Sequence, residues 1–214
     1  MKKDKEKTSS SLLETIASPT TSDTLKEYAE VGIDYFIEDG AYKDIPIFNT
    51  IISVCKIGIS ISDHRLMSKI SKFIYRLSDV SVEERSKTLN ELENDEKYRR
   101  KIGEFLLEIL DKVESEKKPE ILAKIFKAKA QNTITVEMFY RLCKVAESVS
   151  LIDLPELRRF LNSNHEERLT FDEVFLQSLV YCGLAKSDSV FEDTIYTPNK
   201  VYEKFIELNL DHLE

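Results

Sequence analysis

Apolar residues recur at helical spacing along nearly the whole chain, and few residues interrupt the pattern. The 214 residues include only 5 Gly and 5 Pro, the residue types on which tight turns depend. All-β folds need many such turns, so this scarcity favours helices joined by short connections. Hydrophobic residues make up 42% of the chain, enough to bury a core. The sequence therefore predicts a mainly α fold built as a multi-helix bundle.

The predicted helices share apolar residues three and four positions apart, and most begin at a capping residue or a first-turn proline. They cover residues 24–38, 47–61, 63–77, 94–113, 119–126 and 135–149, with a capping box at Ser81 and Glu84 and a short helix from Asp153. The stretch from Ile45 to Ile61 is apolar nearly all round. It predicts a central buried helix, and its β-branched residues leave a strand open as the alternative.

The first residues of the chain, MKKDKEKTSS, are charged and then polar. They predict a disordered basic tail, taken as residues 1–19, followed by a helical domain over 20–150 and a smaller module over 151–214. No apolar core of a secretory signal follows the charged start. The stretch 45–61 falls short of the roughly 20 apolar residues that cross a bilayer. We therefore expect a cytoplasmic protein.

The last 45 residues follow a different pattern. A helix carrying Phe171, Val174, Phe175, Leu179 and Val180 is predicted behind a capping box at Thr170 and Glu173, and it stops at Gly183. Two β-type runs come next, at 184–186 and 194–197, and Pro198 begins a final helix. This order resembles the second half of winged-helix domains, which adds a small winged-helix-like α+β module to the predicted fold.

That resemblance implies DNA or protein as the ligand of the module. From Leu151 to the end there are six Lys or Arg against 13 Asp or Glu, and the predicted wing SDSVFED is acidic. A wing that contacts DNA should be neutral or basic. The formal net charge of −8 argues in the same direction for the whole chain. A protein partner is therefore favoured over nucleic acid.

The central helices are similar to a group of uncharacterised bacterial helical proteins. The similarity lies in DIPIFNTIISVCKIGISISDHRLMSKISKFIYRL and KYRRKIGEFLLEILDKVESEKKPEILAKIFKA. The group is associated with mobile elements and antiviral defence, and the resemblance implies no established activity. The segment ILAKIFKAKAQNTITVEMFYRL also resembles helical hairpins of the tellurite-resistance type, whose acidic metal-site residues are not matched here.

The sequence contains no recognisable catalytic or metal-binding motif. His64, His165 and His212 have no Cys or carboxylate at a triad or metal spacing. The five glycines are too far apart for a phosphate-binding loop. Calcium is excluded from residues 127–138, because Lys127, Lys129 and Met138 occupy positions that need oxygen ligands. We predict no enzyme activity, no cofactor and no metal, and expect Cys55, Cys143 and Cys182 to be buried thiols.

The candidate interaction face is a basic stripe on the helix predicted at 63–77. Arg65, Lys69, Lys72 and Arg76 recur at i, i+4, i+7 and i+11, so one helix face carries all four cations. Such a face meets an anionic lipid, a nucleic acid or an acidic partner, or it is an ordinary solvated surface balanced by internal acids.

The favoured functional prediction is a non-enzymatic interaction or regulatory protein with a protein partner. A DNA-binding transcriptional regulator is one alternative. A peripheral membrane effector of abortive infection is the other, because the apolar stretch 45–61 precedes the basic stripe.

Overall fold

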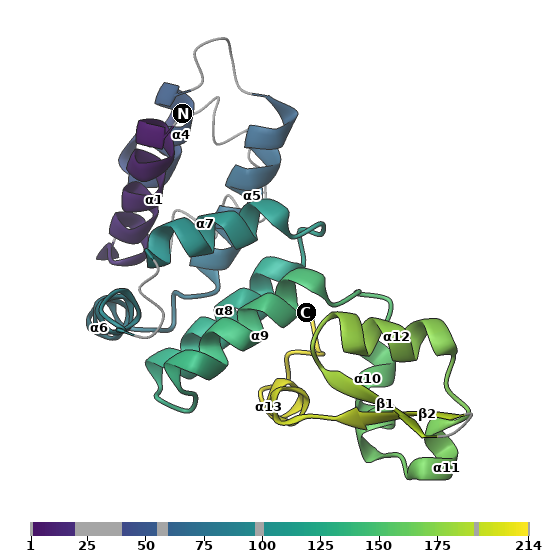
Figure 1. The fold of residues 1–214 in the computed structure, drawn as a ribbon. Helices are drawn as coiled ribbons and strands as arrows, with labels where there is room; N and C mark the ends of the chain where they lie inside the picture. The colour runs from purple at the N-terminus through teal and green to yellow at the C-terminus, as the bar shows by residue number, and fades with distance from the viewer. Residues whose placement is uncertain (1, 20–39, 55–59, 97–100, 191–192, 214) are drawn as a thin grey trace. The chain divides into compact units, whose positions relative to one another are not determined.

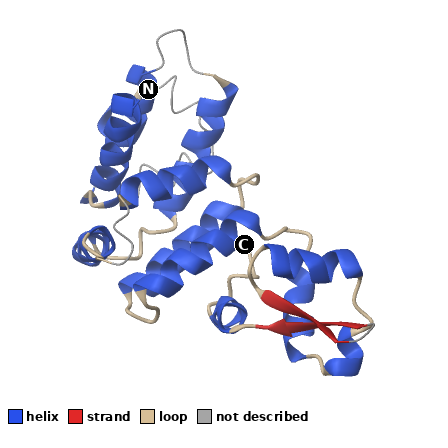
Figure 2. Cartoon of the chain, in the orientation of Figure 1, coloured by secondary structure: helices blue, strands red, loops and turns tan. Residues whose placement is uncertain are grey.

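A computed structural model describes residues 2–19, 40–54, 60–96, 101–190 and 193–213 (Figure 1). Helices dominate, and the strands of these residues form one antiparallel sheet of two strands near the C-terminus (Figure 2). The mainly α class with a small α+β part is confirmed. The predicted helix at 24–38 lies outside the described residues.

Contacts divide the chain into two compact units, Met1–Val136 and Glu137–Glu214. The division falls after Val136, not after residue 150 as predicted. The physical reason lies in α9, which spans Val136–Ser148. Its side chains Tyr140 and Val145 line the same cavity as Cys182 and Val201, so α9 packs within the C-terminal unit.

The first unit is helical throughout its described residues. Its elements are α1 (Lys2–Ile16), the 3-10 turn η2 (Ala41–Asp44), α4 (Pro46–Val54), α5 (Ile61–Tyr75), α6 (Val82–Glu93), α7 (Ile102–Lys112) and α8 (Lys118–Ala130). Helix α1 packs on α4, α6 and α7, while α5 packs on α7 and α8. Phe73 of α5 meets Phe126 of α8 edge to face at 6.2 Å between ring centroids, which marks the core between these two helices.

The disordered tail predicted for residues 1–19 is wrong for residues 2–16, which form α1. The helix buries Leu12 and Ile16 completely. Its hydroxyl residues, which suggested a polar tail, serve the packing: the Ser11 hydroxyl lies 2.7 Å from that of Thr50 on α4. The Thr15 hydroxyl accepts from the Ile47 amide at 3.1 Å. Small polar side chains thus join α1 to the start of the apolar stretch.

The apolar stretch begins as a helix rather than a strand over its described part. Helix α4 buries Ile47, Phe48, Thr50 and Ile51, so this part belongs to the core of the first unit. Residues 55–59 of the stretch lie outside the described residues. No helix in the described part of the chain is long and apolar enough to cross a membrane.

Capping residues set several helix starts, though not always those predicted. The capping box of Ser81 and Glu84 is present at α6. The helix predicted from residue 63 begins earlier, because Ser60 is the N-cap of α5 and Asp63 is its N3 partner. Likewise, Asp172 caps α12 in place of the predicted Thr170, accepting from the amides of residues 174 and 175.

The second unit contains α9, four further helices and the hairpin. Its remaining elements are α10 (Leu154–Asn162), α11 (His165–Arg168), α12 (Glu173–Tyr181), β1 (Ala185–Val190), β2 (Asp193–Pro198) and α13 (Lys200–Glu207). The strands pair antiparallel from Ala185 opposite Pro198 to Val190 opposite Asp193. Helix α12, the hairpin and α13 follow one another in the order predicted from the sequence.

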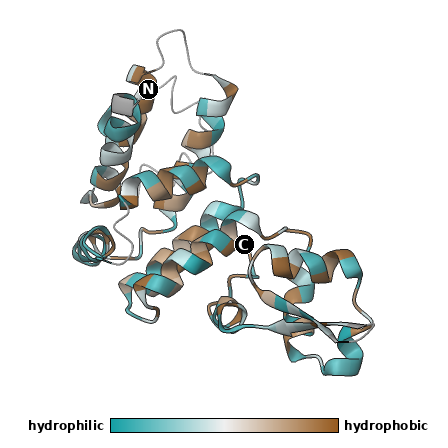
Figure 3. Cartoon of the chain, in the orientation of Figure 1, coloured by the Kyte–Doolittle hydropathy of each residue, from teal (hydrophilic) through white to brown (hydrophobic). Residues whose placement is uncertain are grey.

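Aromatic side chains fill the core of the second unit. Phe160 of α10 lies 5.2 Å from Phe171 and 5.8 Å from Phe175, both edge to face, and 6.1 Å from the stacked ring of Tyr202, as ring centroids. Tyr202 and Phe160 are completely buried. Along most helices hydrophobic and hydrophilic residues alternate around the axis (Figure 3), as expected for helices that bury one face.

Candidate functional site

The basic stripe lies on α5, but most of its charge is used inside the first unit. The Lys69 ammonium donates to the Asp111 carbonyl at 2.9 Å, although only 8% of Lys69 is exposed. Lys72 pairs with Glu116 at 2.5 Å, and Arg76 pairs with Glu120 at 3.2 Å. All three acceptors belong to α7, α8 or the segment between them.

The electrostatics of the stripe agree with these contacts. Burial lowers the pKa of Lys69, which the nearby Asp111 and Glu116 partly offset. The hydrogen bond from Lys72 lowers the pKa of Glu116. Glu120 is itself buried and also pairs with Lys124, at 3.1 Å. A buried charged group with an internal partner, such as Lys69, is less available to an external anion, because its internal contact must first be broken.

Arg65 is the stripe residue left on the surface. It is exposed, and it has no ion pair among the residues that the structure describes. The four residues predicted as an interaction face therefore divide: Lys69, Lys72 and Arg76 join α5 to the α7–α8 region, while Arg65 alone remains a simple surface cation. In the described residues, the stripe is mainly a packing seam.

A different surface stands out on α12, the helix that precedes the hairpin. Val174 is 75% exposed and Tyr181 is 85% exposed. Val174 belongs to the apolar residues of the predicted helix, yet the helix buries Phe175, Leu176 and Leu179 and leaves Val174 exposed. The outward face of α12 is thus apolar at positions 174 and 181, which lie two helical turns apart.

A third exposed apolar residue directly precedes the residue that joins α10 to α12. Ile152, 86% exposed, directly precedes Asp153. The Asp153 carboxylate accepts from the Ser178 hydroxyl at 2.6 Å, which holds the start of α10 against the middle of α12. We call Ile152, Val174 and Tyr181 the α12 apolar surface. The sequence could have indicated this surface through Tyr181, because its position does not match the helical spacing of the buried residues of α12.

Acidic residues next to the α12 apolar surface give its border a negative charge. Asp172 and Glu173 begin the helix, and both are exposed. Helix α12 itself, EVFLQSLVY, contains no lysine or arginine. Strand β1 adds exposed Asp188 beside a single exposed Lys186. The surface is therefore apolar with acidic residues at its border.

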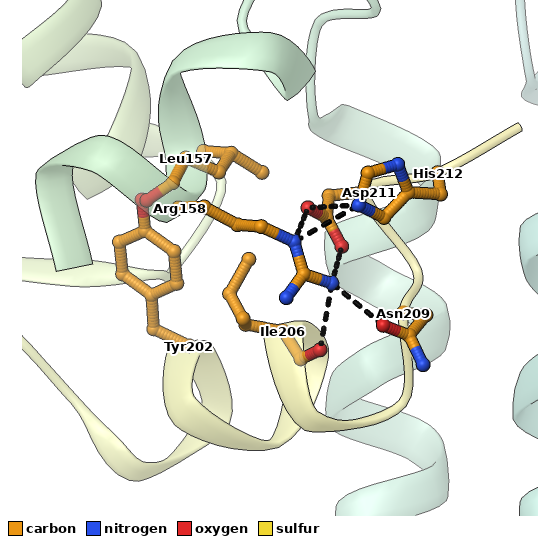
Figure 4. Close-up of polar contacts among 7 residues, drawn as sticks. All are labelled: Leu157, Arg158, Tyr202, Ile206, Asn209, Asp211 and His212. Carbon is orange, nitrogen blue, oxygen red and sulfur yellow. Dashed lines mark hydrogen bonds and ion pairs between the residues drawn. The ribbon is translucent and has the colours of Figure 1, made fainter. Parts of the chain in front are cut away.

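The C-terminal end of α13 is fixed to α10 by Arg158 (Figure 4). The guanidinium donates through Nε and Nη2 to the two carboxylate oxygens of Asp211, at 2.6 and 2.9 Å, and the Asp211 side chain is 2% exposed. It also donates to Asn209 Oδ1 at 2.7 Å and to His212 Nε2 at 3.0 Å. These partners engage Nε and Nη2 of the guanidinium, so Arg158 acts as a structural clamp.

Tyr202 of α13 also contacts α10, next to the Arg158 clamp in the sequence (Figure 4). Its hydroxyl donates to the Leu157 carbonyl at 2.8 Å. Burial raises the pKa of Tyr202, so the phenol is held neutral and serves as a hydrogen-bond donor. This arrangement fixes the second-unit core and places no reactive group in the open.

The residues screened for chemistry are not assembled into a reactive site in the described part of the chain. His165 is exposed on the short α11, and His212 lies beside Asp211 in the clamp. No group of three or more His, Cys, Asp or Glu is placed to hold a metal there. Cys143 and Cys182 are free and buried, and burial raises the pKa of Cys143. Cys55 lies outside the described residues.

Comparison with known proteins adds no family to these observations. No family model, curated protein or solved structure matches the chain. Any functional argument therefore rests on the residues themselves.

Proposed function

We propose that this protein is a non-enzymatic interaction protein that docks a protein partner on the α12 apolar surface. The observation that carries the proposal is the exposure of Val174 and Tyr181, 75% and 85%, on one helix. Among the described residues only five large hydrophobic side chains are strongly exposed, and three of them make up this surface. Exposed apolar residues grouped in this way are typical of protein contact sites.

The charge around the surface specifies the partner. Asp172 and Glu173 border it, so a complementary partner presents apolar side chains surrounded by Lys or Arg. Aromatic residues such as Tyr181 are frequent anchors of protein interfaces, because they bury a large area with few rotatable bonds. The absence of cations from α12 favours protein over DNA, since a helix in the major groove relies on Arg and Lys.

The basic stripe does not support the membrane alternative. Three of its four cations have acceptors within the first unit. An anionic membrane surface attracts basic side chains that are exposed, at about 1 kcal/mol for each. Arg65 alone supplies too little for stable binding.

The test is a comparison of two sets of surface variants. Val174→Ser with Tyr181→Ser removes the apolar groups of the proposed surface, while Leu169→Ser removes another exposed apolar side chain of the same unit, 62% exposed but outside α12. Circular dichroism checks that all variants fold. Each protein, immobilised, is then used to capture proteins from an extract of the native cells.

We expect one partner to bind wild type and Leu169→Ser, and to bind the double variant at least tenfold more weakly. Raised salt should weaken the complex, because acidic residues border the surface. Equal capture by the double variant would show that the partner uses another surface. Fluorescence anisotropy with duplex DNA at low salt tests the DNA-binding alternative. Micromolar binding of DNA by the wild type that the double variant loses would replace this proposal by the DNA-binding one.

A further inference from the structure

A cavity of about 310 Å³ lies within the second unit, between α9, the end of α12 and the first turn of α13. It is separate from the Arg158 clamp and its lining includes none of the three residues of the α12 apolar surface. Its volume is at the lower end of the range for small-molecule sites, roughly 300–1,000 Å³. The cavity therefore suits a short ligand or the last side chain of a peptide.

The floor of the cavity is apolar. Tyr140 and Val145 from α9 line it together with Cys182 and Val201, and each of these residues is less than 9% exposed. An apolar floor favours a hydrocarbon group, because polar atoms would lose their water there without gaining partners. Sugars and nucleobases fit this lining poorly.

Two cations supply the polar part of the lining. Arg141 and Lys144, one turn apart on α9, have side chains that are 59% and 48% exposed. Their acidic partners are Glu137 and Glu147 on the same helix, at 2.9 and 2.5 Å. Exposed pairs of this kind within one helix are weak, so an arriving anion can replace them. The lining itself contains no Asp or Glu.

Gly183 keeps one wall of the cavity open and fixed. Its φ of +83° is a conformation that other residues rarely adopt, and a Cβ built on it would meet nothing within 4 Å. The Asn199 side chain donates to the Gly183 carbonyl at 2.9 Å, and the Asn199 amide donates to the Leu184 carbonyl at 3.1 Å. The wall is thus held by hydrogen bonds before any ligand arrives.

We infer that this cavity binds a monocarboxylate that carries a short apolar chain. The chain lies on the floor formed by Tyr140, Val145 and Val201, and the carboxylate pairs with Arg141 and Lys144. The planar guanidinium suits a carboxylate, because two parallel N–H groups match its two oxygens. The same chemistry is offered by a free acyl carboxylate and by the C-terminal residue of a peptide.

The experiment is a titration of the ¹⁵N-labelled protein, followed by the amide signals of Gly183 and Val201. The probes are octanoate, octan-1-ol, a pentapeptide ending in Leu with a free carboxylate, and the same peptide as its amide. Arg141→Ala with Lys144→Ala removes the cations. Lys112→Ala is the matched control, because its side chain is 49% exposed and also pairs within its own helix, with Glu108.

We expect saturable shifts of the Gly183 and Val201 signals with octanoate or with the free-carboxylate peptide. Whichever of the two binds identifies the source of the carboxylate. Octanol or the amide should bind at least tenfold more weakly, and the double variant should lose at least tenfold in affinity while Lys112→Ala loses none. The inference is overturned if neither carboxylate shifts these signals, or if the neutral probes and the double variant bind equally well.

Discussion

Reversing two charges of the basic stripe tests whether the stripe is a packing seam. Lys69→Glu with Lys72→Glu replaces a buried ammonium and its exposed neighbour by carboxylates. Lys69 donates to the carbonyl of Asp111, in the last turn of α7. A carboxylate there loses this bond and faces the negative end of the α7 dipole. We expect the double variant to be less stable than wild type.

The magnitude follows from the two environments. Loss of a charge-assisted hydrogen bond costs about 2 kcal/mol, and an unpaired buried carboxylate about 2 kcal/mol more. The exposed Lys72–Glu116 pair contributes only about 0.5 kcal/mol. The total loss of unfolding free energy is about 4.5 kcal/mol. In a chain of this size it lowers the melting temperature by roughly 10 °C. Differential scanning calorimetry measures the shift.

Arg65→Glu is the control on the same helix. Arg65 is exposed and has no ion pair among the described residues, so its reversal should change the unfolding free energy by no more than about 0.5 kcal/mol. Sedimentation with anionic vesicles completes the test, and neither wild type nor the variants should sediment. A double variant that melts like wild type, beside a wild type that sediments with the vesicles until salt is raised, would refute this reasoning.

Three further perturbations probe the packing. Gly103→Ala should cost about 1–3 kcal/mol in urea unfolding, because its Cβ would lie 2.7 Å from the Ser9 carbonyl oxygen. Cys143 should resist alkylation in the folded protein, measured by mass spectrometry, since burial raises its pKa and blocks access; rapid labelling would contradict its burial. Hydrogen bonds from Lys129 and Lys72 lower the pKa values of Glu91 and Glu116, so these carboxylates should stabilise the fold above pH 4.5, their ordinary pKa, and lose that contribution as the pH falls below it. Chemical denaturation at pH 7, 5 and 3 measures the loss, and unchanged stability at pH 3 would contradict the prediction.

Local signals predicted the helices well where the cause of the structure is itself local. Ser81 and Glu84 cap α6, and Pro119 stands in the first turn of α8. Gly183 adopts a positive φ directly after Cys182, the C-cap of α12. Each feature depends on residues within a few positions of one another, so the sequence displays it directly.

The features that the sequence missed depend on distant partners. The stripe looked like a free surface because the acceptors of Lys69, Lys72 and Arg76 lie 42 to 44 positions away. Val174 is one of the apolar residues of the predicted helix, yet it is exposed and neighbouring Phe175 takes the inward place. Tertiary packing decides which side of such a helix faces the core, and periodicity alone does not.

Helix α1 has a consequence for how the chain folds during synthesis. Its contact with α7 includes the ion pair of Glu6 and Lys101, residues 95 positions apart. At about 5–20 residues per second, α1 leaves the ribosome on the order of ten seconds before α7 can cover it. During that interval α1 can pack on α4 but not yet on α7. The packing of α1 in the first unit is thus completed only when a segment made much later becomes available.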